Sequence, residues 1–469
     1  MIRRYDGKME MVKMKQKSIS RDFTEGKISN QLLRFTIPFM LSNALQVLYS
    51  TVDMVIVGHY VGTPGLSAVS QSSLIINFAT MVCLGFANAG QVLVSQSIGA
   101  GKKKEMNDII GTLFSLMTII SLILSAVFLV SREWIADIMN IPIESRAMSL
   151  DYLIICGAGL FFTAGYNMVS AVLRGMGDSK RPLLFIGIAS AVNLVLDIVF
   201  TGFCNMGVAG AALATIIGQA ISFIFSLVFL YKNKTSFGFD FEKQSFLIRP
   251  KYTKMILSLG TPMAIQSGCI NLSMLFVNAM INDVGVVASA TFGVGVRIDD
   301  IVNKISQGIQ YAAMPMISQN IAAGKQKRAE SVVHYSWIFA SVLTVFFMTA
   351  YLLFGKQLFM MFSDDPLVHD MSSTFVAAIM WMFPAFAAMR GSHAFIQGIG
   401  HAKLSLILSL LDGVILRIGL SWLFGIVLNM GFYGFVLGYG LAPYGCAIPG
   451  TIYFLSGKWK KRKVLAEDI

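Results

Sequence analysis

Two aspartates and an asparagine lie inside apolar stretches in the first half of this 469-residue chain. Asp53 lies within LYSTVDMVIVGHYVG, and Asn193 and Asp197 lie within NLVLDIVF. A separation of four residues places the amide and the carboxylate of the second stretch on one face of a helix. Two nearby carboxylates raise each other's proton affinity, and carboxylate and amide oxygens also ligate hard cations. Together these residues predict an oxygen-lined pocket that binds a proton or Na⁺.

A carboxylate in such a stretch is costly if the stretch crosses a membrane. An ionised acid at the centre of a transmembrane helix costs about 2.5–3.5 kcal/mol on insertion scales unless it is paired or protonated. Intramembrane acids are therefore candidates for function. The structural alternative is a buried, hydrogen-bonded cluster that only holds helices together.

The second half of the chain carries a different set of charged residues within its apolar stretches: Arg297, Asp299, Asp300, Lys304, Arg390, Asp412 and Arg417. Asp300 lies three residues after Arg297 and four before Lys304, and both spacings allow pairing along one helix face. Leaving either sign of charge alone in an apolar interior is costly. We therefore expect ion pairs within this half of the chain rather than direct contacts with a ligand.

Composition places these residues in a membrane protein. The chain is 55% hydrophobic and only 13% charged, and its mean hydropathy is +0.68. A soluble globular protein of this composition would have too few polar residues to cover its water-exposed surface. The net charge of +12 would suggest a nucleic-acid partner in a soluble protein, but its placement along the chain fits membrane topology instead. The five cysteines are widely spaced and indicate neither a disulfide framework nor a zinc site.

Twelve apolar stretches are long enough to cross about 30 Å of hydrocarbon as helices. They cover residues 33–60, 66–96, 109–131, 148–173, 183–204, 208–231, 255–282, 286–320, 331–355, 372–399, 402–427 and 432–456. Most of the 37 Lys and Arg residues lie in alternate connections, whereas the other connections hold only Arg132, Arg146 and Lys356. Because cytoplasmic loops carry the excess of positive charge, we expect both termini to be cytoplasmic in a plasma (inner) membrane.

The chain also contains an internal repeat. SQSIGAGKKKE at 95–105 returns as SQNIAAGKQKRAE at 318–330, and LRGMGDSKRPLL at 173–184 returns as IQGIGHAKLSLI at 396–407, both at an offset of 223. Six spans per half is an even number, so the halves share one orientation. We expect two six-helix lobes related by a pseudo-twofold axis along the membrane normal, with a substrate path at their seam. A structural duplication without transport, or a duplicated channel or membrane enzyme, would give the same repeat.

The predicted organisation is all-α. It comprises a basic cytoplasmic arm (1–30), an N-lobe (31–231), a cytoplasmic linker (232–254), a C-lobe (255–456) and a basic tail (457–469). The arm and the tail are expected to contact anionic lipid. We expect the protein to be a monomer.

Several of these features together resemble the multidrug and toxic compound extrusion (MATE) family over residues 28–456. Pro38 lies fifteen residues before Asp53, as in the first helix of the family, and NLVLDIVF resembles its paired amide and carboxylate. GVAGAALATIIGQ carries Thr215 at the hydroxyl position of the family. The SQxxGAGK pattern and RGMGDSKRP also resemble its cytoplasmic loops. The combination is specific, although each part alone is weak.

The resemblance implies a function for these residues. It assigns Asp53, Asn193, Asp197 and Thr215 to one cation-coupling site for H⁺ or Na⁺, although spacing alone does not bring their three spans together. It also implies that Pro38 lets protonation of Asp53 bend the first helix; a static kink is the alternative. The protein would then be an antiporter that exports cationic or amphipathic small molecules.

The second half departs from the acid pattern of the first. Asp53 aligns near Val277 and Asp197 near Leu420. Some branches of the family use an acid of the C-lobe for Na⁺, but the seventh span offers only the amides Gln266, Asn271 and Asn278. We therefore expect the coupling site in the N-lobe.

Two other functions, a flippase and an enzyme, would require features that the sequence supports poorly or lacks. A flippase or exporter of a lipid-linked precursor or polysaccharide, from the related superfamily, would need a basic cleft, and the interleaved aspartates argue against one. An enzyme is not expected, because HExxH, GxSxG and a histidine cluster are all missing from the sequence. The sequence has no ATP-binding motif, so we expect an ion gradient as energy source and no cofactor besides the coupling ion.

Overall fold

The computed structural model describes residues 21–102, 104–139 and 141–469. Within these ranges every regular element is a helix, as predicted. Helices suit this composition, because each one satisfies its own backbone hydrogen bonds in the absence of water. The first twenty residues of the predicted basic arm lie outside the described part of the chain.

The N-lobe contains seven α-helices and one π-helix. They are α1 (Ile28–Tyr60), α2 (Thr63–Gly99), α3 (Glu105–Ile138), α4 (Ile143–Ala158), α5 (Leu160–Gly175), α6 (Lys180–Asp197), π-helix η1 (Ile198–Phe203) and α7 (Gly207–Lys232). The predicted linker forms two short helices, α8 (Lys234–Phe237) and η2 (Lys243–Phe246).

The C-lobe repeats this order with more breaks. Its elements are α9 (Pro250–Asn282), α10 (Val286–Ala322), α11 (Gln326–Met360), α12 (Pro366–Ile379), α13 (Met382–Gly398), α14 (Ala402–Leu410), η3 (Leu411–Leu416), α15 (Arg417–Trp422), η4 (Leu423–Val427), α16 (Gly431–Leu441) and α17 (Tyr444–Leu455). The tail adds η5 (Lys458–Lys461) and α18 (Leu465–Asp468).

The described residues contain nine helices that are long and apolar enough to cross a membrane, or eleven if each of two bent pairs is one span. The bent pairs are α4–α5, at 46°, and α12–α13, at 48°. The remaining predicted span, 286–320, is helix α10, which has 37 residues and is as long as α2. Its four charged residues and its amides make it too polar to qualify by composition.

The backbone confirms the duplication. α1 and α9 both have 33 residues, and α2 and α10 both have 37. Left-handed residues also recur within one position of the repeat offset, including the non-glycine pair Asn205 (φ 54°) and Asn429 (φ 51°). A positive φ is uncommon for a non-glycine residue, so its recurrence at equivalent turns marks two copies of one fold.

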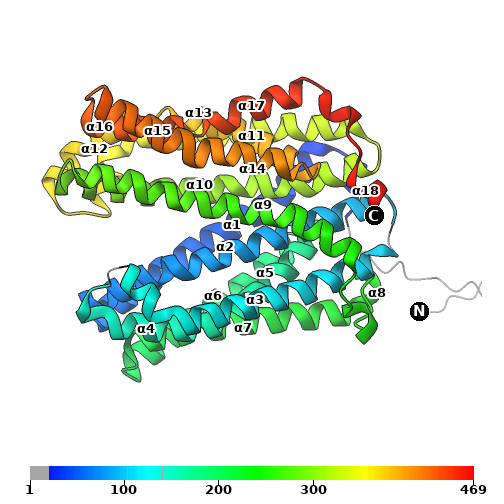
Figure 1. Cartoon of the computed structure of the whole chain (residues 1–469), viewed down its shortest axis with the longest axis horizontal. Helices are drawn as coiled ribbons and strands as arrows, with labels where there is room; N and C mark the ends of the chain where they lie inside the picture. The colour runs from blue at the N-terminus through cyan, green and yellow to red at the C-terminus, as the bar shows by residue number, and fades with distance from the viewer. Residues whose placement is uncertain (1–20, 103, 140) are drawn as a thin grey trace, which may run out of the picture.

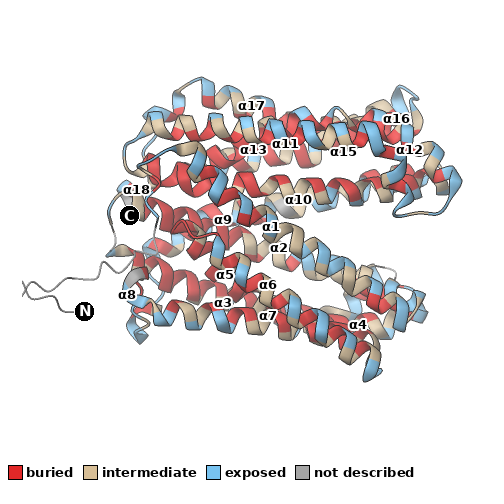
Figure 2. Cartoon of the chain, turned by 180° about the vertical axis from the view of Figure 1, so that it is seen from behind, coloured by how far each residue is buried: buried red, intermediate tan, exposed pale blue. Residues whose placement is uncertain are grey.

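The two lobes lie side by side, with α1 and α2 of the N-lobe facing α9 and α10 of the C-lobe (Figure 1). α2 packs against α9, and α1 packs against α10. We call the end of the bundle that carries α8 and α18 the basal end (Figure 1). Buried residues concentrate in the seam toward the basal end, whereas the lobes diverge at the opposite end (Figure 2).

The repeated SQ sequences meet across the seam at the basal end. The carbonyl oxygen of Gly175 in the N-lobe accepts a hydrogen bond from Ser95 Oγ (3.0 Å) of its own lobe. It accepts a second from Gln319 Nε2 (3.4 Å) of the C-lobe. The two lobes also touch through backbone here, since a Cβ at Gly99 would lie 2.1 Å from the carbonyl oxygen of Gln319.

The same arrangement recurs in the other lobe. The carbonyl oxygen of Gly398 accepts a hydrogen bond from Ser318 Oγ (2.8 Å) of its own lobe and one from Gln96 Nε2 (3.0 Å) of the N-lobe. In each repeat the serine binds its own lobe and the glutamine binds the partner lobe. The repeated sequence therefore closes the basal end by reciprocal contacts.

Both terminal segments also cross the seam. Phe23 N donates to Gln319 Oε1 (3.0 Å), and Phe23 O accepts from Arg328 Nε (2.9 Å), which with the bonds to Thr24 O and Glu25 O places residues 23–25 on the C-lobe. In the other direction, Lys102 Nζ of the N-lobe donates to Ala466 O (2.8 Å) in α18. Each lobe thus holds a terminal segment of the other.

The seam loosens with distance from the basal end. Asn43 Nδ2 donates to Lys304 O (2.6 Å), which is the one hydrogen bond between α1 and α10 among the described residues. Beyond it, Val55 on α1 is 64% exposed and Val286 on α10 is 86% exposed. The lobes therefore pack tightly at the basal end and separate away from it (Figure 2).

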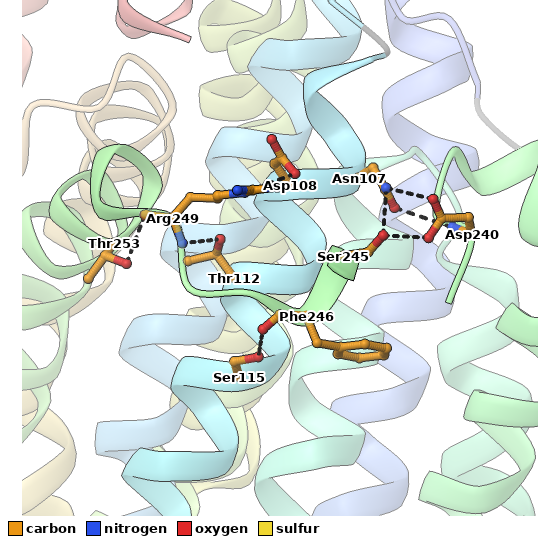
Figure 3. A network of polar contacts seen from close by, with 9 residues as sticks. All are labelled: Asn107, Asp108, Thr112, Ser115, Asp240, Ser245, Phe246, Arg249 and Thr253. Carbon is orange, nitrogen blue, oxygen red and sulfur yellow. Dashed lines mark hydrogen bonds and ion pairs between the residues drawn. The ribbon is translucent and has the colours of Figure 1, made fainter. Parts of the chain in front are cut away.

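The linker docks on α3 through a polar network (Figure 3). Asn107 Nδ2 donates to Asp240 Oδ2 (2.8 Å) and to Ser245 Oγ (2.9 Å). Ser115 Oγ donates to Phe246 O (2.5 Å), and Arg249 N donates to Thr112 Oγ1 (3.3 Å). The segment before α9 is therefore fixed on the N-lobe before the chain enters the C-lobe.

Candidate functional site

Three helices of the N-lobe bring the predicted coupling residues together. Asp53 lies on α1, Asn193 and Asp197 lie at the end of α6, and Thr215 lies on α7. α6 packs against both α1 and α7. Gly218 permits the close approach of α7, because a Cβ there would lie 3.0 Å from Ala189 O of α6.

The four side chains form one cluster. Asn193 Nδ2 donates to Thr215 Oγ1 at 3.4 Å. The Asp53 carboxyl lies within interaction distance of Asp197 and Thr215, and Asp197 also interacts with Asn193. Asp197 is fully buried and Asn193 nearly so, whereas Asp53 and Thr215 are half-buried. Tertiary packing thus gathers all four residues predicted for the site.

The oxygens of this cluster outnumber its donors. Asp53 Oδ1, Asn193 Oδ1 and both carboxyl oxygens of Asp197 are buried and have no hydrogen-bond partner among the described residues. A buried acceptor without a donor is costly. A proton on a carboxyl group, or a hard cation bound by these oxygens, would remove that cost. The oxygen ligands of the cluster therefore fit either H⁺ or Na⁺.

A small cavity of about 10 Å³ adjoins the cluster, with room for a species of the size of one water. Besides Asn193 and Thr215, its polar lining consists of Tyr49, Ser190 and Gln219. Ser190 Oγ and Gln219 Oε1 are buried and have no hydrogen-bond partner in the described chain.

These three residues, Tyr49, Ser190 and Gln219, were not predicted from the sequence. A signal for them exists, since Tyr49 precedes Asp53 by one helical turn, Gln219 follows Thr215 by one turn and Ser190 precedes Asn193 by one turn. The polar face of each helix therefore extends one turn beyond the residue that the sequence predicted for the site.

A break in helix geometry positions Asp197. It is the last residue of α6, and the chain continues as the π-helix η1 up to Phe203. π-Helical turns inside helices are frequent at functional sites. Thr201 Oγ1, in this π-helix, is also buried without a hydrogen-bond partner in the described residues.

Pro38 lies in α1, which runs unbroken from Ile28 to Tyr60. The proline is buried on the basal side of Asp53. It supplies no N–H for the preceding turn, so the Arg34 carbonyl lacks its usual helical donor. Bending of α1 at this point stays a prediction.

Two of the expected ion pairs in the C-lobe are formed. Lys304 Nζ lies 2.9 Å from Asp300 Oδ2 along α10. Arg417 lies 3.1 Å from Asp412 Oδ1, and this second pair is buried.

The other C-lobe charges do not pair as expected. Arg297 is exposed, and the described residues provide no ion pair for it. Asp299, two residues later, points inward and accepts a hydrogen bond from the Tyr351 hydroxyl (2.6 Å). Arg390 is buried and donates to amide oxygens of Gln310 and Asn303 rather than to a carboxylate. The expectation of ion pairs was wrong for these three residues, because Asp299 and Arg390 face inward toward uncharged partners and Arg297 lies on the exposed face of α10.

Comparison with known proteins decides the family. The MatE family model matches residues 38–199 and again residues 262–423, one match in each lobe. The chain belongs to the multidrug and toxic compound extrusion (MATE) family. The two matches begin at Pro38 and Pro262, which are both prolines inside a first helix of a lobe. The MATE family match thus reproduces the internal repeat.

Relatives within the MATE family cover almost the whole chain. "Probable multidrug resistance protein YpnP" of Bacillus subtilis is 30% identical over 448 residues, which span 95% of this chain and 99% of the relative. "Probable multidrug resistance protein NorM" of Thermotoga maritima is 24% identical over 449 residues, spanning 94% and 95%. The chain is thus a multi-pass membrane protein of a multidrug efflux transporter family.

A solved MATE family structure shares the fold. A multidrug resistance MATE family transporter in an outward-facing conformation superposes with a TM-score of 0.87 at 21% identity. The superposition covers 94% of this chain and 99% of the other. This agreement supports the two-lobe architecture.

Proposed function

We propose that this MATE family chain is a secondary antiporter that exports cationic or amphipathic small molecules while H⁺ or Na⁺ enters. The observation that carries the proposal is the cluster of Asp53, Asn193, Asp197 and Thr215, in which four buried oxygens of the first three residues lack a donor within the described chain. Relatives named for multidrug resistance support small-molecule cargo. Transport driven by an ion gradient requires no further cofactor.

The orientation is part of the proposal. The basal end faces the cytoplasm of a plasma (inner) membrane, because the repeated basic loops around Lys102 and Lys325 lie there. In this orientation the described conformation is closed to the cytoplasm and has its lobes apart on the outer side. It corresponds to the state that releases cargo and takes up the coupling ion.

Coupling follows from the position of α1. This helix carries Asp53 toward α6 and α7 and also packs against α10 across the seam. Ion binding at Asp53 and Asp197 changes the packing of α1 against α6. Because α1 also packs against α10, this movement is transmitted to the C-lobe. Ion and cargo are linked only if each favours a different facing of the lobes, which is the thermodynamic requirement for exchange.

Dye efflux from proteoliposomes tests the proposal, with a pH gradient and a Na⁺ gradient imposed separately. Asp53→Asn and Asp197→Asn are each expected to abolish gradient-driven efflux, because neither can release a proton or contribute a charged ligand. Asp370→Asn, at an exposed aspartate outside the cluster, is the matched control and should transport normally. Size-exclusion profiles establish that the variants are folded. Full efflux in both cluster variants contradicts the assignment.

A flippase or exporter of lipid-linked anionic cargo is the second candidate. The exposed Arg297 on α10, without an ion pair in the described residues, favours it. The pairing of Lys304 and Arg417 with aspartates reduces the positive charge of the C-lobe. Gradient-driven efflux of a water-soluble dye is expected from the antiporter and not from the flippase.

A further inference from the structure

Two arginines from opposite lobes approach one tyrosine in the closed part of the seam. Arg174 lies in the last turn of α5 in the N-lobe, and Arg390 lies in the middle of α13 in the C-lobe. Tyr311 of α10 lies within electrostatic range of both guanidinium groups. We call these three residues the Tyr311 cluster. It is separate from the oxygen cluster on α1, α6 and α7.

Arg174 is held by neutral groups. Its Nε donates to Gln91 Oε1 (3.1 Å), and its guanidinium lies 5.5 Å from the centre of the Phe39 ring. Gln91 in turn donates through Nε2 to Tyr311 O (3.3 Å) across the seam. Phe39 and Tyr311 also contact each other, with ring centres 6.5 Å apart.

Arg390 is held in the same way on the other side. It donates through Nη1 to Gln310 Oε1 (3.3 Å) and through Nη2 to Asn303 Oδ1. Its guanidinium lies 5.1 Å from the centre of the Phe386 ring. Arg390 is only 2% exposed, and its Nε is buried with no hydrogen-bond partner among the described residues.

Neither arginine forms an ion pair with a carboxylate of the described chain. A buried charge without a counter-charge is costly, and amide oxygens only partly compensate for it. Two such charges lie beside the interface of the lobes: Arg174 bonds to Gln91, which bonds across the seam to Tyr311, and Arg390 bonds to Gln310, the residue before Tyr311. In a transporter that rocks its lobes apart, this part of the seam opens, which breaks the Gln91–Tyr311 hydrogen bond and the Phe39–Tyr311 contact and exposes the arginines on either side.

Guanidinium groups bind planar oxyanions with paired hydrogen bonds. The aromatic rings of Phe39, Tyr311 and Phe386 would offer stacking faces to an apolar ring beside that anion. We propose that the Tyr311 cluster binds a carboxylate or phosphate group of the exported molecule when the basal end is open. Acidic or zwitterionic amphipathic molecules are then the preferred cargo. This inference rests on the proposed export function and narrows its substrate class.

Two dyes that differ at one group provide the test. Rhodamine 110 has a free carboxylate, and rhodamine 123 is its methyl ester. Fluorescence anisotropy of each dye with the purified, detergent-solubilised full chain gives the ratio of their affinities without any ion gradient. The wild-type protein should bind rhodamine 110 more tightly, and Arg174→Gln and Arg390→Gln should each lower the affinity ratio about tenfold.

Two further variants separate binding from structure. Arg390→Lys keeps the charge and should retain part of the ratio. Arg132→Gln removes an arginine that, within the described residues, donates to Leu129 O of its own helix α3, and it should leave the ratio unchanged. Equal affinity for the two dyes, binding of neither dye, or an equal loss of both in the arginine variants overturns the proposal. Preference for rhodamine 110 without gradient-driven efflux would instead contradict the proposed function and leave the site intact.

Discussion

At the scale of single residues, aspartates in apolar helices are satisfied differently in the two lobes. Both carboxyl oxygens of Asp197 in the N-lobe lack a hydrogen-bond partner in the described chain. In the C-lobe, Asp412 pairs with Arg417 at 3.1 Å, and Asp299 accepts from Tyr351 at 2.6 Å through Oδ1, while only its Oδ2 lacks a partner in the described chain. An aspartate that already has a strong partner gains less from binding an ion. The residue geometry therefore favours ion binding in the N-lobe.

The buried pair Asp412–Arg417 gives a prediction about stability. Asp412→Asn leaves the guanidinium of Arg417 buried without its counter-charge, so it should destabilise the protein by about 3–5 kcal/mol. The exposed pair Lys356–Asp370 is the control, and Asp370→Asn should cost less than about 1 kcal/mol. Thermal melting of the purified variants measures both effects. Similar melting temperatures for the two variants would contradict the buried pair as a stabilising contact.

At the scale of elements, the linker is a docked segment rather than a loose tether. Asp240 accepts hydrogen bonds from Ser245 Oγ (2.6 Å), from Glu242 N (2.9 Å) and from Asn107 Nδ2 (2.8 Å) (Figure 3). These bonds, with that from Ser245 first, lower the pKa of Asp240 below its ordinary value. Because the docked state lowers the pKa, the ionised carboxylate stabilises docking.

This pKa shift predicts how linker docking depends on pH. The stabilisation is fully present above the undocked pKa of about 3.9 and is lost as the pH falls through the lower, docked value. The protection factors of residues 240–247 against hydrogen exchange should therefore stay high at neutral pH and fall only in that acidic range. Asp240→Ala should lower them at neutral pH, whereas Glu242→Ala, at an exposed neighbour, should not. Slow exchange in Asp240→Ala would show that Asp240 does not hold the linker.

At the scale of the whole molecule, the repeated SQ sequences link the lobes. Gln96 of the N-lobe binds Gly398 O, and Gln319 of the C-lobe binds Gly175 O. Alternating access with the basal end open requires both bonds to break. The two glutamines are thus placed to set the balance between the conformations.

Removing these bonds should shift that balance. Gln96→Leu and Gln319→Leu are each expected to lower the ratio of basally closed to basally open protein about fivefold, since a net hydrogen bond contributes about 1 kcal/mol. Spin labels at positions 104 and 327, in a cysteine-free background, report the distance across the basal end by double electron–electron resonance. Gln244→Leu, at an exposed linker residue, is the control. Unchanged distance distributions in both glutamine variants would exclude this role.

Much of the fold could be predicted from the sequence. Helix number, the two halves and the one-turn spacing of Asn193 and Asp197 follow from hydropathy and helical period, which are local properties of the chain. The repeat offset likewise predicted the matching helices and turns. Family resemblance added Thr215 and the expectation that it joins Asp53 at one site.

Only the tertiary structure decided which side chains meet. The approach of α1, α6 and α7, the inward turn of Asp299 toward Tyr351 and the neutral partners of Arg390 depend on how helices pack and rotate against one another. Pairings such as Gln96 with Gly398 join residues about 300 positions apart in sequence, and helical periodicity carries no information on them. The sequence determined which polar groups enter the membrane, and packing determined which of them are left to bind an ion or a cargo.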